Sequence, residues 1–171
     1  AAAIKLNGKG PVFFVQERVG RNNSHFKMYK FRSMNPDAES QKDKLVPSSD
    51  TTSPLFKMVD DPRITPIGKF LRKWSIDELP QLLNVFIGNM SLVGPRPPLQ
   101  SEVDHYEDHV NRKFMVKPGI TGLWQVSGRS NLSWEDSVRL DLYYVENWSI
   151  TTDIIIMFRT IISVIKRDGA Y

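Results

Sequence analysis

Two strand-like segments joined by a turn constrain the fold of this chain more than any other feature of its sequence. Residues 11–19 are rich in β-branched and aromatic side chains, and residues 26–34 carry aromatic residues on both faces of a second extended segment. Gly20–Ser24, between them, is dominated by turn-forming residues. The pattern predicts a β-hairpin. The one further extended segment that we predict, Leu123–Val126, is short, so the chain is expected to be mainly helical.

Residues 66–74 have the pattern of an amphipathic helix. Ile67, Phe70, Leu71 and Trp74 recur at i, i+3, i+4 and i+7, and basic residues occupy the opposite face. Two placements fit this pattern: a helix that packs on the core with a solvated back, or a helix that lies in a membrane interface.

The remaining elements complete the predicted architecture. Further helices are expected at about Asp77–Ile87, Ser101–Phe114, Ser133–Asn147 and Thr152–Lys166. Residues 35–62 are polar and contain four prolines, which predicts a long mobile loop with at most a short helix at Ala38–Leu45. We therefore expect an α+β fold: a helix-rich single domain with a small N-terminal β-hairpin and amphipathic interfacial helices. A chain of 171 residues is long enough to bury a core.

Charge and composition narrow the classes of function. The net charge of +4 favours anionic partners such as phosphates, nucleotides or acidic lipids. No nucleic-acid-binding motif is present, so nucleic acid is not an expected partner. The absence of cysteine excludes disulfides, thiolate catalysis and cysteine-ligated metals.

The adjacent carboxylates Asp77 and Glu78 stand at the predicted start of a helix, and two interpretations fit them. In the first, Ser75 and Glu78 form a capping box and Asp77 compensates the helix dipole. In the second, one carboxylate is a nucleophile that the helix end keeps ionised, and its neighbour binds Mg²⁺. The dipeptide alone favours the cap.

A series of motifs gives the dyad a context. In chain order they are Tyr29–Met34, Asp61–Thr65, Ile76–Gln81, Met90–Pro97, Lys117–Gly122, Val126–Arg129 and Leu140–Val145, followed by an apolar helix that contains Asp153. From about Gly10 to Gly169, this order resembles the bacterial sugar transferase family, the monotopic phosphoglycosyl transferases.

The resemblance implies an activity and roles for named residues. Such enzymes move a sugar-1-phosphate from a UDP-sugar to undecaprenyl phosphate and release UMP, by a ping-pong reaction through an aspartyl phosphosugar. Asp77 would be the nucleophile and Glu78 a ligand of Mg²⁺. The other positions that the resemblance implies are the anion-binding Arg72, Arg96 and Arg129, the basic strand residues Lys30 and Arg32, and Asp153 as a further acidic, metal-binding position.

Several of these residues have a plain structural alternative. Arg96 in its proline-rich loop could pair with an acid, and Asp153 could simply cap a helix. Trp124 and Trp134 could stack a uracil or a sugar, or belong to the core.

The resemblance also implies a place in the cell. Residues 1–10 would be the remnant of, or the exit from, an N-terminal membrane segment, and 11–171 the catalytic domain at the cytoplasmic face of the bacterial inner membrane. The expected partners are a UDP-sugar, undecaprenyl phosphate and the lipid surface, with a homodimer left open. Two other functions fit the charge pattern: a membrane-surface binding module without activity, and a phosphohydrolase. No residue indicates which sugar is transferred.

Overall fold

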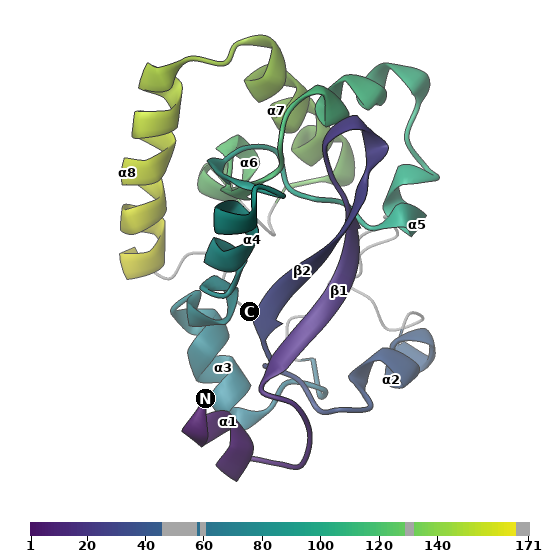
Figure 1. Ribbon diagram of the computed structural model, residues 1–171, viewed down its shortest axis with the longest axis vertical. Helices are drawn as coiled ribbons and strands as arrows, with labels where there is room; N and C mark the ends of the chain where they lie inside the picture. Colours follow the sequence, from purple (N-terminus) through teal and green to yellow (C-terminus); the bar gives the residue numbers. More distant parts are fainter. Residues whose placement is uncertain (46–57, 59–60, 129–131, 167–171) are drawn as a thin grey trace.

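The predicted hairpin is present in the computed structural model, which describes residues 1–45, 58, 61–128 and 132–166, without the side chains of 42–45. Strands β1 (Phe13–Val19) and β2 (His25–Phe31) pair antiparallel, with Phe13 opposite Phe31. The 3₁₀ turn η1 (Arg21–Asn23) joins them. The hairpin runs through the middle of the molecule, with α3, α4 and α8 to one side and α2 and α5 to the other (Figure 1).

Helices make up most of the described chain, as predicted. The α-helices are α1 (Ala2–Leu6), α2 (Ala38–Leu45), α3 (Pro66–Lys73), α4 (Gln81–Ile87), α5 (Gln100–Val103), α6 (Leu123–Ser127), α7 (Trp134–Glu146) and α8 (Ile150–Lys166), and the 3₁₀ elements are η1, η3 (Ile76–Glu78) and η4 (Asp108–Met115). The helices expected at 38–45, 66–74, 133–147 and 152–166 are confirmed. Ser133 caps α7 by accepting a hydrogen bond from the Asp136 N–H. The α+β, helix-rich class with a small hairpin is therefore correct.

Two predicted elements are wrong, and packing explains both. The single helix expected at Ser101–Phe114 is divided into α5 and η4, because Tyr106 between them stacks on Trp134, with ring centroids 5.3 Å apart. The segment expected to be extended at Leu123–Val126 is the helix α6. Its Leu123 and Val126 pack on the core cluster around Tyr144, and tertiary contacts of this kind override a weak local preference.

A short parallel pair of strands brings two of the motifs together. Strand β3 (Ser91–Val93) pairs with β4 (Gly119–Thr121), and the Gly94 N–H donates to the Thr121 carbonyl. A Cβ on Gly94 would lie 2.6 Å from the Lys117 carbonyl oxygen, so only glycine fits this close backbone approach. The proline-rich loop after β3 is thereby fixed against the turn that precedes α6.

In the described part of the chain, the core includes two small apolar clusters and the buried Lys113–Asp141 ion pair. One cluster contains Phe26, Met28 and Met90, and the other Val93, Tyr144 and Ile156. The Lys113 ammonium of η4 lies 2.7 Å from the Asp141 carboxylate of α7, and both side chains are buried.

Much apolar surface stays exposed on α4 and α8. On α4, Leu82, Leu83 and Phe86 are about half or more exposed, and Phe86 reaches 91%. Helix α8 exposes Ile154, Ile155, Phe158, Ile161, Ile162 and Ile165, and it lies along one side of the molecule (Figure 1). Of the helices described, none combines the length and apolar character needed to cross a bilayer.

Candidate functional site

One face of the hairpin forms a wall of a cavity of about 800 Å³. Residues opposite each other in the register point to the same face, and this face carries Phe14, Gln16, Arg18, Met28 and Lys30. The other walls are the chain around Asp77, the loop after β3, the β4–α6 turn, and Thr160 and Val164 of α8. The cavity therefore joins the predicted dyad to several of the motifs.

The dyad does not begin a helix, so the capping-box interpretation is wrong. Asp77 and Glu78 belong to the 3₁₀ turn η3, and α4 begins only at Gln81, after Pro80. Ser75 makes no side-chain capping hydrogen bond, and its φ of 53° lies in the left-handed region, which is uncommon for a residue with a side chain. A strained turn, rather than the end of a long helix, presents the two carboxylates to the cavity.

The environment of Asp77 also differs from the expectation. Its side chain is buried, and this burial raises the pKa of the carboxyl. The positive charges of Lys30 and Arg72 lower the pKa, and the negative charge of Glu78 raises it further. The net direction is upward. The ionisation of Asp77 therefore depends on its two cationic neighbours and not on a helix dipole.

The two cations come from different elements. Lys30 of β2 donates a 2.6 Å hydrogen bond from Nζ to Glu78 Oε1. Arg72, in the last turn of α3, donates from Nε to Ser33 Oγ at 2.9 Å. Burial lowers the pKa of Arg72, and the Asp77 charge opposes that shift. The structure thus brings Lys30, Arg72 and the dyad together, as a phosphate-handling site requires.

Arg96 and Arg32 have other partners. The guanidinium of Arg96 forms a bidentate salt bridge with Glu102, at 2.7 and 3.1 Å. This pairing with an acid is the structural alternative that the sequence left open for Arg96. Arg32 donates to the carbonyls of Ile4, Gly8 and Lys9, and so holds the N-terminal segment against β2. Both arginines line the cavity, but their hydrogen bonds hold protein groups.

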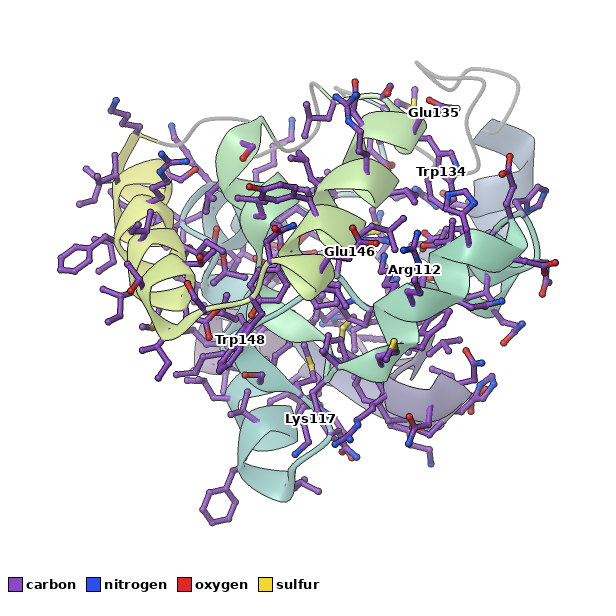
Figure 2. The ribbon with its side chains drawn as sticks, turned by 90° about the horizontal axis from the view of Figure 1, so that it is seen from above. Arg112, Lys117, Trp134, Glu135, Glu146 and Trp148 are labelled. Atoms are coloured by element: carbon purple, nitrogen blue, oxygen red, sulfur yellow. The ribbon has the colours of Figure 1, made fainter. Side chains whose placement is uncertain are left out.

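The structure describes all but one of the remaining predicted site residues. Arg129 lies outside the described residues. Asp153 of α8 is not among the residues that line the cavity, and its two oxygens accept hydrogen bonds from Tyr144 and Trp148. Its predicted place beside the dyad is therefore not supported. Trp134 packs on Tyr106 at the start of α7, beside η4 (Figure 2), whereas Trp124 lines the cavity.

Sequence reasoning missed two polar residues that organise the site. Arg18 is 9% exposed and donates from Nη1 to the Pro97 carbonyl and from Nη2 to Gln16 Oε1. Its Nε has no hydrogen-bond partner among the residues that the structure describes. The sequence could have indicated Arg18 through its position in the strand, because residues 14, 16 and 18 share one face of the predicted strand.

The second missed residue is Asn84 of α4, which has no exposed surface. Its amide donates to the Lys27 carbonyl at 2.7 Å and accepts from the Tyr29 N–H at 3.1 Å. One side chain thus ties α4 to the backbone of β2.

The carboxylates fit a magnesium ion that is shared with a substrate. No group of three or more acidic, histidine or cysteine residues within the described segments could hold a metal by itself. Mg²⁺ in phosphoryl-transfer sites is commonly bound by one or two carboxylates together with substrate phosphates, and Glu78 supplies one such carboxylate beside Asp77.

Comparison with known proteins gives a consistent result. A family model described as bacterial sugar transferase matches residues 1–167. Relatives include galactosyl transferase CpsE of Streptococcus agalactiae, 52% identical over 98% of this chain, and the UDP-galactose-lipid carrier transferase of Erwinia amylovora, 48% identical over 98%. The undecaprenyl-phosphate galactose phosphotransferase of Salmonella typhimurium is 46% identical over 95%. The chain spans 37%, 36% and 35% of the lengths of these three relatives, respectively.

Proposed function

Because the chain belongs to the bacterial sugar transferase family, we propose that it transfers a sugar-1-phosphate from a UDP-sugar to undecaprenyl phosphate and releases UMP. The observation that carries the proposal is a buried carboxylate, Asp77, in a cavity beside two cations, Lys30 and Arg72. Two relatives are named for a UDP-linked sugar and for undecaprenyl phosphate, which supports the choice of donor and acceptor.

The reaction proceeds in two displacements at Asp77. In the first, an Asp77 oxygen attacks the sugar-bearing phosphorus of the donor, an O–P bond forms, and the bond to the UMP oxygen breaks. In the second, an oxygen of the lipid phosphate attacks the same phosphorus and frees Asp77. The charges of Lys30 and Arg72 keep the carboxylate ionised and neutralise phosphate oxygens as they become more negative.

Glu78 would hold Mg²⁺ together with the donor diphosphate, and Asp77 would stay available as the nucleophile. The ion would supply charge neutralisation on the diphosphate oxygens. The Lys30 ammonium donates to Glu78 at 2.6 Å, so Lys30 would orient the carboxylate that holds the ion.

The exposed apolar surface supports a site at the membrane. Helix α8, which exposes several isoleucine side chains and Phe158, also contributes Thr160 and Val164 to the cavity. A lipid-bound phosphate could therefore enter the cavity while its chain stays in the bilayer beside α8. We place this surface on the cytoplasmic leaflet of the inner membrane, where α4 and α8 lie in the interface.

The decisive experiment incubates the protein with Mg²⁺, undecaprenyl phosphate in detergent and a panel of UDP-sugars, and measures UMP. We expect UMP from at least one sugar, and a phosphosugar adduct by mass spectrometry when the lipid is omitted. The Asp77→Asn variant should form no adduct. An adduct that persists in Asp77→Asn would exclude Asp77 as the nucleophile.

The same assay separates the two rival functions. A membrane-binding module would bind liposomes with or without Asp77→Asn and release no UMP. A phosphohydrolase would release free sugar phosphate continuously without any lipid acceptor.

A further inference from the structure

The end of the cavity beside the loop after β3 contains a buried cation with an unused hydrogen-bond donor. Arg18 is nine-tenths buried, and its Nε–H has no partner among the described residues. Leaving a buried donor of a charged group unsatisfied is costly, so such a group in a cavity wall indicates a ligand oxygen. The Trp124 indole N–H, in the same cavity wall, also lacks a partner within the described part of the chain.

The charges at this end favour an anion as that ligand. The charge of Arg96 lowers the pKa of Arg18, and the carboxylate of Glu102 raises the pKa of both arginines. The guanidinium groups of Arg18 and Arg96 share the single carboxylate of Glu102, which leaves one net positive charge in a largely desolvated environment. Because Glu102 is engaged with Arg96 through two hydrogen bonds, the excess charge resides on Arg18.

The hairpin register sets the position of Arg18 relative to the dyad. Lys30, the partner of Glu78, lies opposite Phe14, and Arg18 is four residues further along β1, roughly 13 Å away along the backbone. The guanidinium turns back towards the dyad, since its Nη2 reaches Gln16 Oε1 at 2.6 Å. The negative charge of Glu78 also acts on Arg18. Arg18 therefore lies on the same cavity-lining face of the hairpin as Lys30, the partner of Glu78.

We propose that Arg18 binds the phosphate of the leaving nucleotide through its free Nε–H, an inference that rests on the proposed function. When the phosphorus that carries the sugar lies at Asp77, the nucleotide phosphate is the neighbouring group, and a guanidinium suits its oxygens. The Arg96–Glu102 pair holds the Pro97 loop whose carbonyl fixes Arg18. Arg18, and not Arg96, is then the anion-binding arginine of this part of the cavity.

The test compares the binding of UMP and uridine, which differ only in the phosphate. Isothermal titration of the protein in detergent with Mg²⁺ is repeated on Arg18→Gln and on Arg139→Gln, a matched control on an exposed arginine of α7. For Arg18→Gln we expect UMP affinity to fall about tenfold or more, with uridine affinity nearly unchanged. The Arg139→Gln variant should bind both as the wild type does.

Each other outcome overturns the inference. If Arg18→Gln binds UMP as tightly as the wild type does, Arg18 does not contact the phosphate. If the affinity for uridine falls as much as that for UMP, Arg18 acts on the nucleoside or on the fold instead. If Arg18→Gln does not fold, Arg18→Lys is measured in the same way. In the wild type, arginine Nε–H signals in ¹⁵N NMR must include one that moves with UMP and not with uridine.

The proposed function is judged separately, by UMP release from UDP-sugars. If the wild type releases UMP but Arg18→Gln binds UMP with unaltered affinity, the inference about Arg18 is wrong and the proposed function stands. No release from any donor defeats the proposed function, whatever Arg18 binds.

Discussion

Replacing Glu102 by glutamine should destabilise the protein far more than an ordinary loss of a salt bridge. The Glu102 side chain is 3% exposed and accepts three hydrogen bonds, two from Arg96 at 2.7 and 3.1 Å and one from the Leu99 N–H at 3.0 Å. Glutamine keeps the shape but offers one acceptor oxygen and no charge, so the Arg96 cation loses its counter-ion in a dry environment.

The size of the effect follows from burial. Breaking a fully buried pair by removing one partner costs about 3–5 kcal/mol. Because 24% of the Arg96 side chain stays exposed, we expect the low end, about 3 kcal/mol. For a chain of this length, that loss lowers the melting temperature by roughly 6–12 °C.

The assay is urea denaturation of wild type, Glu102→Gln and the matched control Glu146→Gln. Glu146 also pairs with an arginine, Arg112, at 2.6 Å (Figure 2), but the two side chains are 44% and 52% exposed. The control should therefore lose at most about 1 kcal/mol. Equal small losses in the two variants would refute the claim that the Arg96–Glu102 pair is desolvated.

The pH dependence gives a second readout. Burial alone would raise the pKa of Glu102, but the charge and hydrogen bonds of Arg96 outweigh burial and hold the pKa below its ordinary value of 4.5. The stabilisation by ionised Glu102 is therefore present above pH 4.5 and is lost as the pH falls through the lowered pKa. The difference between wild type and Glu102→Gln should shrink in that acidic range.

Three further predictions concern other parts of the molecule. Lys30→Gln removes a charge that lowers the pKa of Asp77, so the acidic limb of the pH profile for adduct formation should move to higher pH; an unmoved limb would contradict the electrostatic role. Gly68→Ala places a Cβ against the Ser33 carbonyl, and the unfolding free energy should fall by about 1–3 kcal/mol or more in urea titrations, whereas no loss would show that α3 can shift. Phe86→Ser, at a side chain that is 91% exposed, should change stability by less than about 0.5 kcal/mol yet weaken liposome flotation, and undiminished flotation would remove α4 from the membrane surface.

The sequence was sufficient for elements whose pattern is local. The β-branched and aromatic segments on either side of a turn predicted the hairpin, and the Ser133 cap predicted the start of α7, because both depend on neighbours within a few positions. The expected helix start at Asp77 failed for the opposite reason. The chain there follows a left-handed Ser75, a conformation that no local propensity favours and that only the surrounding structure imposes.

The same distinction applies to the site. The motif order drew attention to Asp77, Glu78, Lys30 and Arg72, and the structure brings these four residues together. The partner of Arg96 could not be chosen from sequence, because Glu102 reaches it only when the proline-rich loop folds back. Likewise, the strand phase of Arg18 indicates an inward side chain but does not distinguish a core from a cavity.

The amide of Asn84 determines the alignment of the Lys30–Glu78 ion pair. By engaging the Lys27 carbonyl and the Tyr29 N–H, it fixes which residues of β2 lie beside α4. A slip of one residue along β2 would exchange Lys30 for an aromatic neighbour and leave Glu78 facing a ring instead of an ammonium. Since α4 begins three residues after Glu78, one buried side chain sets the alignment of both partners, the ammonium on β2 and the carboxylate that precedes α4.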